Sequence, residues 1–297
     1  MKKLIKFIIS MFLITLSFSI TYAKNNDNPT NSISEYDFAV SVRNMSKEEA
    51  LSNDIDESSY EYYCSNKIEM NLLALKSLSE KELTKYGYNR QQIEVIKEYN
   101  GERIQDYPKL RAVAATLSIT FYKVFAGPTS YKIEAYWNWS SRPIMFGINE
   151  KGTAVLGWHA VDSNNLTSNA CYIPSESSCT VNYYTGEGIF TGSLGQTIIV
   201  DDSYECVHVN HQSMYGYSSS GSLGFAKTGN LYVRTDSVTG ATIEEMGYKF
   251  FYYYESASLS VSITFSWPSI SVSSGMTLAR NRACTLNKNG VLTQYSY

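Results

Sequence analysis

The sequence predicts an α+β protein with a short N-terminal helical segment followed by a large antiparallel β-sandwich or barrel-like domain. Charge is distributed unevenly, because 28 of the 88 residues in 24–111 are charged but only 22 of the 186 residues in 112–297. The second region also alternates apolar and polar residues between Gly, Ser and Asn turns, which is typical of strands buried on one face. We therefore expect a signal peptide over 1–23, a flexible leader over 24–44, a charged helical segment over 45–107 and an antiparallel β domain over 112–297.

The first 23 residues have the pattern of a secretory signal peptide. Lys2, Lys3 and Lys6 form a basic start, the sixteen residues 7–22 are uncharged, and Ala23 completes a small-residue cleavage motif. Sixteen residues are fewer than the ~20 that a membrane-spanning helix needs. We expect cleavage near Ala23 and a protein that is secreted or held at the extracellular face of the cell envelope.

Helix starts recur through the charged segment. The S-x-x-E pattern occurs at 46–49, 58–61 and 79–82, and in such a box the serine and the glutamate satisfy free amides at the helix start. Asn89 can cap a further helix over 90–99. These patterns predict an amphipathic helical cap or spacer.

The clearest strand pattern lies near the C-terminus. Residues 257–267 alternate six apolar side chains with Ser and Thr, Pro268 breaks the pattern, and Ile270 and Val272 resume it. Similar alternation predicts strands over 113–121 and 131–139, and turn residues at 149–152 and 236–240 predict hairpins whose second arms are 153–161 and 241–254.

Composition and motifs exclude several function classes. The net charge is −3 and there is no basic tract, so we expect no nucleic-acid binding. The sequence has no phosphate-binding loop, dinucleotide fingerprint, H-E-x-x-H, G-x-S-x-G or C-x-x-C motif. We therefore expect no cofactor, and a non-enzymatic protein that binds a glycan, the cell wall or a protein ligand. No pattern indicates the oligomeric state.

Reactive residues concentrate in one segment, 201–211. Cys206, His208 and His211 with a neighbouring aspartate are candidate metal ligands, or the reactive groups of a hydrolase. On a regular strand Cys206 and His208 share a face while His211 points the other way, so convergence needs a bulge near Asn210. The alternative is an ordinary strand end. His159 could supply a partner from elsewhere in the chain.

The cysteines allow a disulfide hypothesis, because disulfides persist outside the cell. Cys171 and Cys179 bracket a short loop and could close a hairpin, which would leave Cys206 and Cys284 as a second pair. Cys64 would then remain as a buried thiol on an apolar helix stripe. Free buried thiols throughout are the alternative.

Aromatic residues are candidate sugar-binding groups, since exposed rings beside polar side chains can stack on sugars. The alternative for Trp137 and Trp139 is a place in the core, because they share strand parity with Ile133. The candidate ligand-binding residues are Trp137, Trp139, Trp158, Tyr183 and Tyr184.

Residues 257–274 have a pattern that is also typical of a second kind of function, membrane insertion. Pore-lining strands alternate small polar and aliphatic residues, and 257–267 meets the ~9–11 residues that a strand needs to cross lipid. A membrane-active, β-rich protein that uses this hairpin is therefore the alternative to a binding protein. We favour an ordinary sandwich hairpin, so membrane contact is the alternative and not the favoured expectation.

Three stretches carry a resemblance to a group of proteins. The lysine-rich start ending in Thr21, Tyr22 and Ala23, the helical stretch 78–88 and the tail 258–274 resemble uncharacterised exported proteins of low-GC Gram-positive bacteria. The resemblance implies an envelope or extracellular setting and supplies no site residues.

Overall fold

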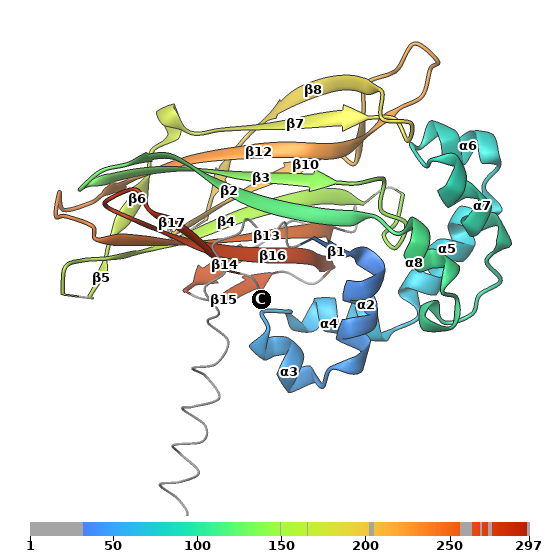
Figure 1. Cartoon of the computed structure of the whole chain (residues 1–297), viewed down its shortest axis with the longest axis horizontal. Helices are drawn as coiled ribbons and strands as arrows, with labels where there is room; N and C mark the ends of the chain where they lie inside the picture. Colours follow the sequence, from blue (N-terminus) through green and yellow to red (C-terminus); the bar gives the residue numbers. More distant parts are fainter. Residues whose placement is uncertain are drawn as a thin grey trace, which may run out of the picture. The chain divides into compact units, whose positions relative to one another are not determined.

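The computed structural model describes residues 32–295, except 149, 165, 202–204, 256–262, 268, 273 and 274. The predicted signal peptide and the start of the predicted leader lie outside the described residues. Most of the described chain is antiparallel β-sheet, and two sheets face each other across a shared core (Figure 1). The predicted antiparallel β architecture is confirmed, and the two facing sheets fit its sandwich form.

Sheet A contains eight strands in the order β1-β2-β3-β12-β7-β8, with β6 and β11 paired to β12. Its strands are β1 (Ile33–Ser34), β2 (Thr116–Ala126), β3 (Ser130–Trp139), β6 (Ala170–Tyr172), β7 (Ser178–Tyr184), β8 (Phe190–Gln196), β11 (Met214–Tyr215) and β12 (Gly224–Ser237). The short helix η2 (Pro174–Glu176) connects β6 to β7.

Sheet B contains seven strands in the order β17-β16-β13-β4-β10-β9, with β5 paired to β4. Its strands are β4 (Lys151–Val161), β5 (Thr167–Ser168), β9 (Ile199–Val200), β10 (Cys206–His211), β13 (Glu245–Glu255), β16 (Met276–Asn287) and β17 (Leu292–Tyr295). A separate hairpin consists of β14 (Ile263–Ser266) and β15 (Ser269–Val272).

The core between the sheets follows from strand alternation. In β3 every second residue is buried, and Ile133, Trp137 and Trp139 face sheet B. The Trp137 ring stacks at 5.7 Å from Phe250 and 6.1 Å from His211, both on sheet B. Large aromatic rings thus fill the space between the sheets.

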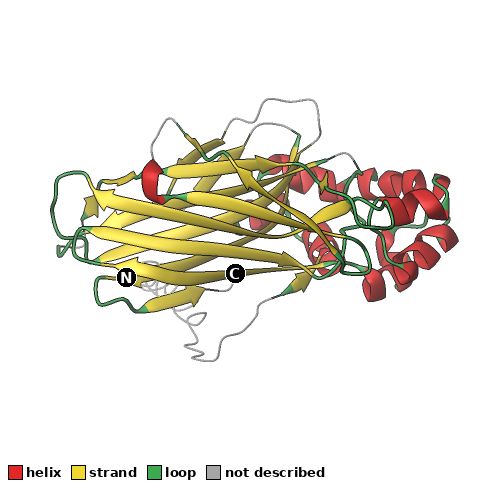
Figure 2. Cartoon of the chain, turned by 90° about the horizontal axis from the view of Figure 1, so that it is seen from above, coloured by secondary structure: helices red, strands yellow, loops and turns green. Residues whose placement is uncertain are grey.

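Helices gather at one end of the strands (Figure 2). They are α2 (Glu35–Asn44), α3 (Lys47–Ser52), α4 (Glu57–Cys64), α5 (Lys67–Ser77), α6 (Glu80–Lys85), α7 (Arg90–Glu98), η1 (Ile104–Asp106) and α8 (Lys109–Val113). Within the described part of the chain, no helix has the length and apolar character needed to cross a membrane.

The helix boundaries correct three predictions. The predicted flexible leader is wrong over 33–44, because β1 and α2 occupy it and the Ser34 side chain caps α2 by accepting from the Asp37 amide at 3.0 Å. Ser46, Ser79 and Asn89 do cap helices, but α4 is capped by Asp56, which places Ser58 inside that helix. The predicted strand at 113–121 begins only at Thr116, because α8 extends to Val113 and residues 114 and 115 connect the helix to the strand.

Helix α4 covers an open sheet edge. Strand β13 pairs with β16 along its whole length, but on the other side β17 pairs only with residues 283–286, so the earlier part of β16 has no described strand on that side. The Ser58 hydroxyl donates to the Met276 carbonyl at 2.6 Å, the Leu278 amide donates to Ser59 Oγ at 2.7 Å, and Tyr63 donates to the Leu278 carbonyl at 2.8 Å. These bonds satisfy backbone groups that an exposed edge would leave open.

A buried carboxylate joins α2 to sheet A. Glu35 accepts backbone N–H groups from Ala115 at 2.8 Å, Ile144 at 2.9 Å and Met145 at 3.0 Å. Burial raises the pKa of Glu35 to about 7, although the three N–H donors act against that rise. The carboxylate therefore connects the first helix, the start of β2 and the loop after β3.

This pKa predicts the pH dependence of stability. Because the folded pKa is raised, the stability that Glu35 contributes is present below about pH 4.5 and is lost as pH rises through about 7. We expect the free energy of unfolding to fall from pH ~5 to ~8, by up to about 1.4 kcal/mol per pH unit, relative to a Glu35→Gln variant. Chemical denaturation of both proteins across this range measures the difference. A wild-type advantage that grows with pH would contradict the raised pKa.

Candidate functional site

The reactive residues of 201–211 do not converge. Strand β10 pairs with β4 without any shift, from Cys206 opposite Gly157 to His211 opposite Gly152. Cys206 and His208 therefore lie on the face of sheet B that points away from the core, and His211 lies on the core face. The predicted metal site is wrong, and no group of three His, Cys, Asp or Glu suited to a metal occurs among the described residues.

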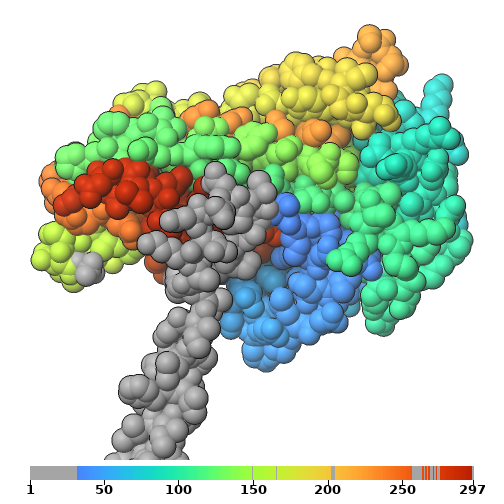
Figure 3. Space-filling view, viewed as in Figure 1, coloured from blue at the N-terminus to red at the C-terminus, as the bar shows by residue number. Residues whose placement is uncertain are grey.

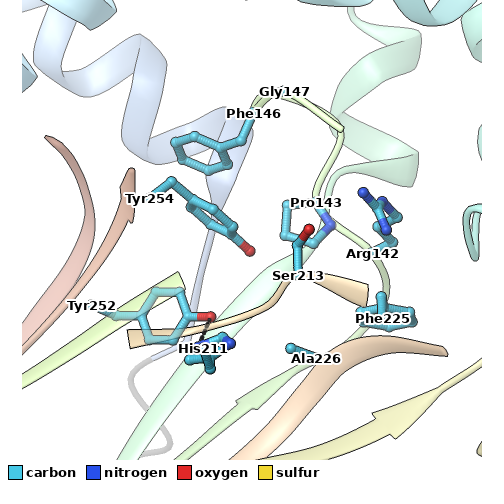
Figure 4. A pocket seen from close by; sticks show the side chains of 10 residues that line it. All are labelled: Arg142, Pro143, Phe146, Gly147, His211, Ser213, Phe225, Ala226, Tyr252 and Tyr254. Carbon is cyan, nitrogen blue, oxygen red and sulfur yellow. Dashed lines mark hydrogen bonds between the residues drawn. The ribbon is translucent and has the colours of Figure 1, made fainter. Parts of the chain in front are cut away.

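His211 is a structural core residue. Its Nδ1 donates to the Gln212 carbonyl at 3.1 Å, and its Nε2 lies 3.0 Å from the Tyr252 hydroxyl, which donates to it (Figure 4). Burial lowers the pKa of His211 to about 4, so the ring is neutral at physiological pH. The adjoining cavity of about 20 Å³, lined in part by Arg142, Phe146 and Tyr254, has room for about one water molecule.

The environment of Cys206 opposes nucleophilic chemistry. Burial, followed by the neighbouring Asp201, raises the pKa of the Cys206 thiol well above its ordinary value. Burial also lowers the pKa of His208. His159 stacks on Trp267 at 5.5 Å instead of approaching a nucleophile. These residues do not form the predicted hydrolase site.

The predicted disulfides are also wrong, because all five cysteines are free thiols. Cys171 and Cys179 lie opposite Asp236 and Leu231, five residues apart on β12, which corresponds to ~17 Å along the strand. Cys206 and Cys284 are separated by β4 and β13, or ~14 Å across three strand spacings. A disulfide needs Cα atoms within about 7 Å. Cys64 is exposed, contrary to expectation.

Thiol titration tests this arrangement. Without reductant, the denatured protein should give five reactive thiols, and the native protein a fast phase from exposed Cys64. Cys64→Ser should remove the fast phase, whereas Cys284→Ser, at a buried thiol, should leave it unchanged. Ellman's reagent provides the measurement. A count of three or fewer thiols after denaturation would show that disulfides form.

Most of the predicted ligand-binding aromatics face the core. Trp137, Trp139, Trp158 and Tyr183 are almost completely buried, so they cannot stack on a ligand. The Trp158 indole donates to the Ala170 carbonyl at 3.0 Å, and the Tyr183 hydroxyl to the Gln212 carbonyl at 3.1 Å. Only Tyr184 lies on an outward position, where Lys227 Nζ sits 5.5 Å from its ring centre.

The opposite side of the same strands carries a second aromatic set. Tyr122 on β2, Glu134 on β3 and Tyr232 on β12 lie in one row, because the strands pair at these residues. The next row contains Tyr136 on β3 opposite Asn230 on β12. All five side chains are solvent-accessible and point away from the core, and Tyr122 is 49% exposed. We call these five residues the tyrosine face.

Polar contacts organise the tyrosine face. The Asn230 amide donates to Glu134 Oε1, and Tyr232 interacts with the same carboxylate. Partial burial, followed by this contact, raises the pKa of Tyr232. Partial burial and the nearby phenols of Tyr122 and Tyr184 raise the pKa of Tyr136. The Tyr136 and Tyr232 phenols are therefore neutral hydrogen-bonding groups at physiological pH.

Further polar residues extend the surface towards β8. The Asn182 amide donates to Thr228 Oγ1 at 3.1 Å, and Ser193 Oγ donates to Asn182 Oδ1 at 2.5 Å. In Figure 3 the residues of β2 and β3 (green) and of β7 and β8 (yellow) lie at the surface. The outward side of sheet A is thus an open surface that combines aromatic rings with amide, hydroxyl and carboxylate groups.

Comparisons with known proteins assign no family. The sequence matches no known protein-family profile and no curated protein. Three solved structures show partial similarity. AvmM, which catalyses macrocyclization in alchivemycin A biosynthesis, has a TM-score of 0.24 and 13% identity, with 55% of this chain and 87% of that chain covered. A pore-forming protein has a TM-score of 0.23 and 11% sequence identity, with 62% of this chain and 90% of that chain covered. The collagen-binding domain of a Staphylococcus aureus adhesin has a TM-score of 0.25 and 9% sequence identity, with 56% of this chain and 99% of that chain covered. These similarities are too low to carry an argument about function.

Proposed function

We propose that this protein binds an extended glycan, such as a cell-wall polysaccharide, on the tyrosine face of sheet A. The observation that carries the proposal is the arrangement of Tyr122, Tyr136 and Tyr232 around Glu134 and Asn230. The signal-peptide pattern of residues 1–23 supports an exported protein that acts at the cell envelope or outside the cell.

The chemistry of the face matches that of a sugar chain. A tyrosine ring offers an apolar surface to the C–H groups of a sugar, while its hydroxyl remains available for hydrogen bonds. The Glu134 carboxylate accepts hydrogen bonds from sugar hydroxyls, and the Asn230 amide both donates and accepts. A single face therefore supplies stacking and hydrogen bonding together.

The shape of the face favours a polymer over a small molecule. Small ligands bind mostly in concave pockets. The tyrosine face instead lies across three adjacent strands, and Tyr122 and Tyr232 are two strand spacings apart, or ~10 Å. A chain of sugars, rather than one ring, would contact all three tyrosines.

Alanine variants test the proposal. Tyr136→Ala and Tyr232→Ala should each weaken binding to purified cell-wall sacculi by about two- to tenfold, because each removes one stacking ring. Co-sedimentation at increasing protein concentration measures the change. Tyr217→Ala is the matched control, since Tyr217 is 68% exposed but lies outside the face.

Two results would contradict the proposal. Either the wild-type protein does not bind sacculi or isolated wall glycans, or the Tyr136 and Tyr232 variants bind as tightly as the Tyr217 control. Circular dichroism of each variant confirms that the fold is retained, because all three side chains are at the surface.

A further inference from the structure

The β14–β15 hairpin is attached to the rest of the protein differently from every other described strand. Its four residue pairs, from Ile263 opposite Val272 to Ser266 opposite Ser269, join its two strands only to each other. It belongs to neither large sheet, so no described strand ladder holds it in place. An isolated two-stranded hairpin is only marginally stable in water. Side-chain contacts must therefore retain it.

Two glycines on the outer face of sheet B receive the aromatic side chains of the hairpin. A Cβ atom on Gly157 would overlap the Phe265 ring, and one on Gly247 would lie 2.7 Å from Trp267. These glycines are on the adjacent strands β4 and β13, where Gly247 pairs with His159. The His159 ring stacks on Trp267 at 5.5 Å with an interplanar angle of 13°. Phe265 and Trp267 thus lie directly over bare backbone.

The segment also has a distinctive sequence. Residues 256–279 contain no charged side chain, although the chain has 53 charged residues. Ile263, Phe265 and Trp267 alternate with Thr and Ser, so one side of the strand is apolar. Ile263 and Phe265 are buried where they now lie. Leaving sheet B would therefore expose apolar surface unless another apolar phase received it.

We propose that the hairpin leaves sheet B at a lipid bilayer and inserts Ile263, Phe265 and Trp267 into its interfacial layer. Insertion buries again the apolar side of the hairpin that departure exposes, and tryptophan is favoured at the headgroup level. Hydrocarbon does not tolerate unpaired strand edges. The hairpin therefore stays at the interface, where water still reaches its backbone.

The junction with β16 limits how much of the chain can leave sheet B together with the hairpin. Gly275 has a φ of +93°, which suits a glycine hinge, and β16 begins at the next residue. From there, α4 holds the strand through its bonds to Met276 and Leu278. Sheet B can thus remain intact while the hairpin moves. This inference is independent of the glycan proposal, because the tyrosine face is on sheet A.

Fluorescence quenching by brominated lipid tests the proposal. Of the four tryptophans, Trp137, Trp139 and Trp158 are buried in the core, so only Trp267 can approach lipid. Phosphatidylcholine vesicles brominated near the headgroup suit the net negative chain. We expect them to quench wild-type emission and to leave the emission of Trp267→Phe unchanged. No quenching, or equal quenching in both proteins, would overturn the proposal.

Glycine variants test how the hairpin is held. Gly157→Ala and Gly247→Ala should tighten vesicle binding by about fivefold or more. Each added methyl group would overlap the Phe265 or Trp267 ring and so weaken the packing of the hairpin on sheet B. Gly195→Ala on β8 is the control, since its Cβ would meet no atom closer than 4.0 Å. If the Gly157→Ala and Gly247→Ala variants fold but bind vesicles no more tightly than this control, the proposal is overturned. If they fail to fold, the comparison with Trp267→Phe decides.

Discussion

The two-residue alternation of β3, fixed in register with β2 and β12, is the constraint on which the rest of this structure depends. It directs Trp137 and Trp139 into the core and Glu134 and Tyr136 to the opposite surface. A shift of one residue would exchange these sets and bury a carboxylate. The buried Trp137 ring, which contacts Phe250 and His211, therefore fixes the register, and the register creates the tyrosine face.

Polar contacts then attach the helices to the two sheets. Glu35 joins α2 to the start of β2, and α4 covers the open edge of β16. The buried ammonium group of Lys249 on β13 pairs with Asp54, which reaches it from a left-handed backbone conformation with a φ of 59°. Each contact satisfies a buried charge or an open backbone group, so the helical segment is part of the sandwich structure and not a free spacer.

Local patterns in the sequence predicted local structure well. Alternation identified β3 and the core position of Trp137, the capping box at 79–82 identified α6, and the Asn89 cap identified α7. Features that depend on distant contacts were missed. The helix at 35–44 is stabilised by Glu35, whose partners lie about eighty to 110 residues away. The predicted disulfide pairs were wrong because the strand order, which the sequence does not encode locally, keeps the cysteines of each pair apart. Applying the parity argument to Tyr136, which neighbours Trp137, would have located the tyrosine face.

The structure therefore presents two distinct surfaces: an open tyrosine face on sheet A and a hairpin-covered face on sheet B. The proposed glycan site lies on the outward side of β2, β3 and β12. Hydroxyl-radical footprinting with and without soluble wall glycan shows whether ligand contacts this surface. We expect protection of Tyr122, Tyr136 and Tyr232 and no change at Tyr217. Unchanged labelling of these three tyrosines under saturating glycan would contradict it.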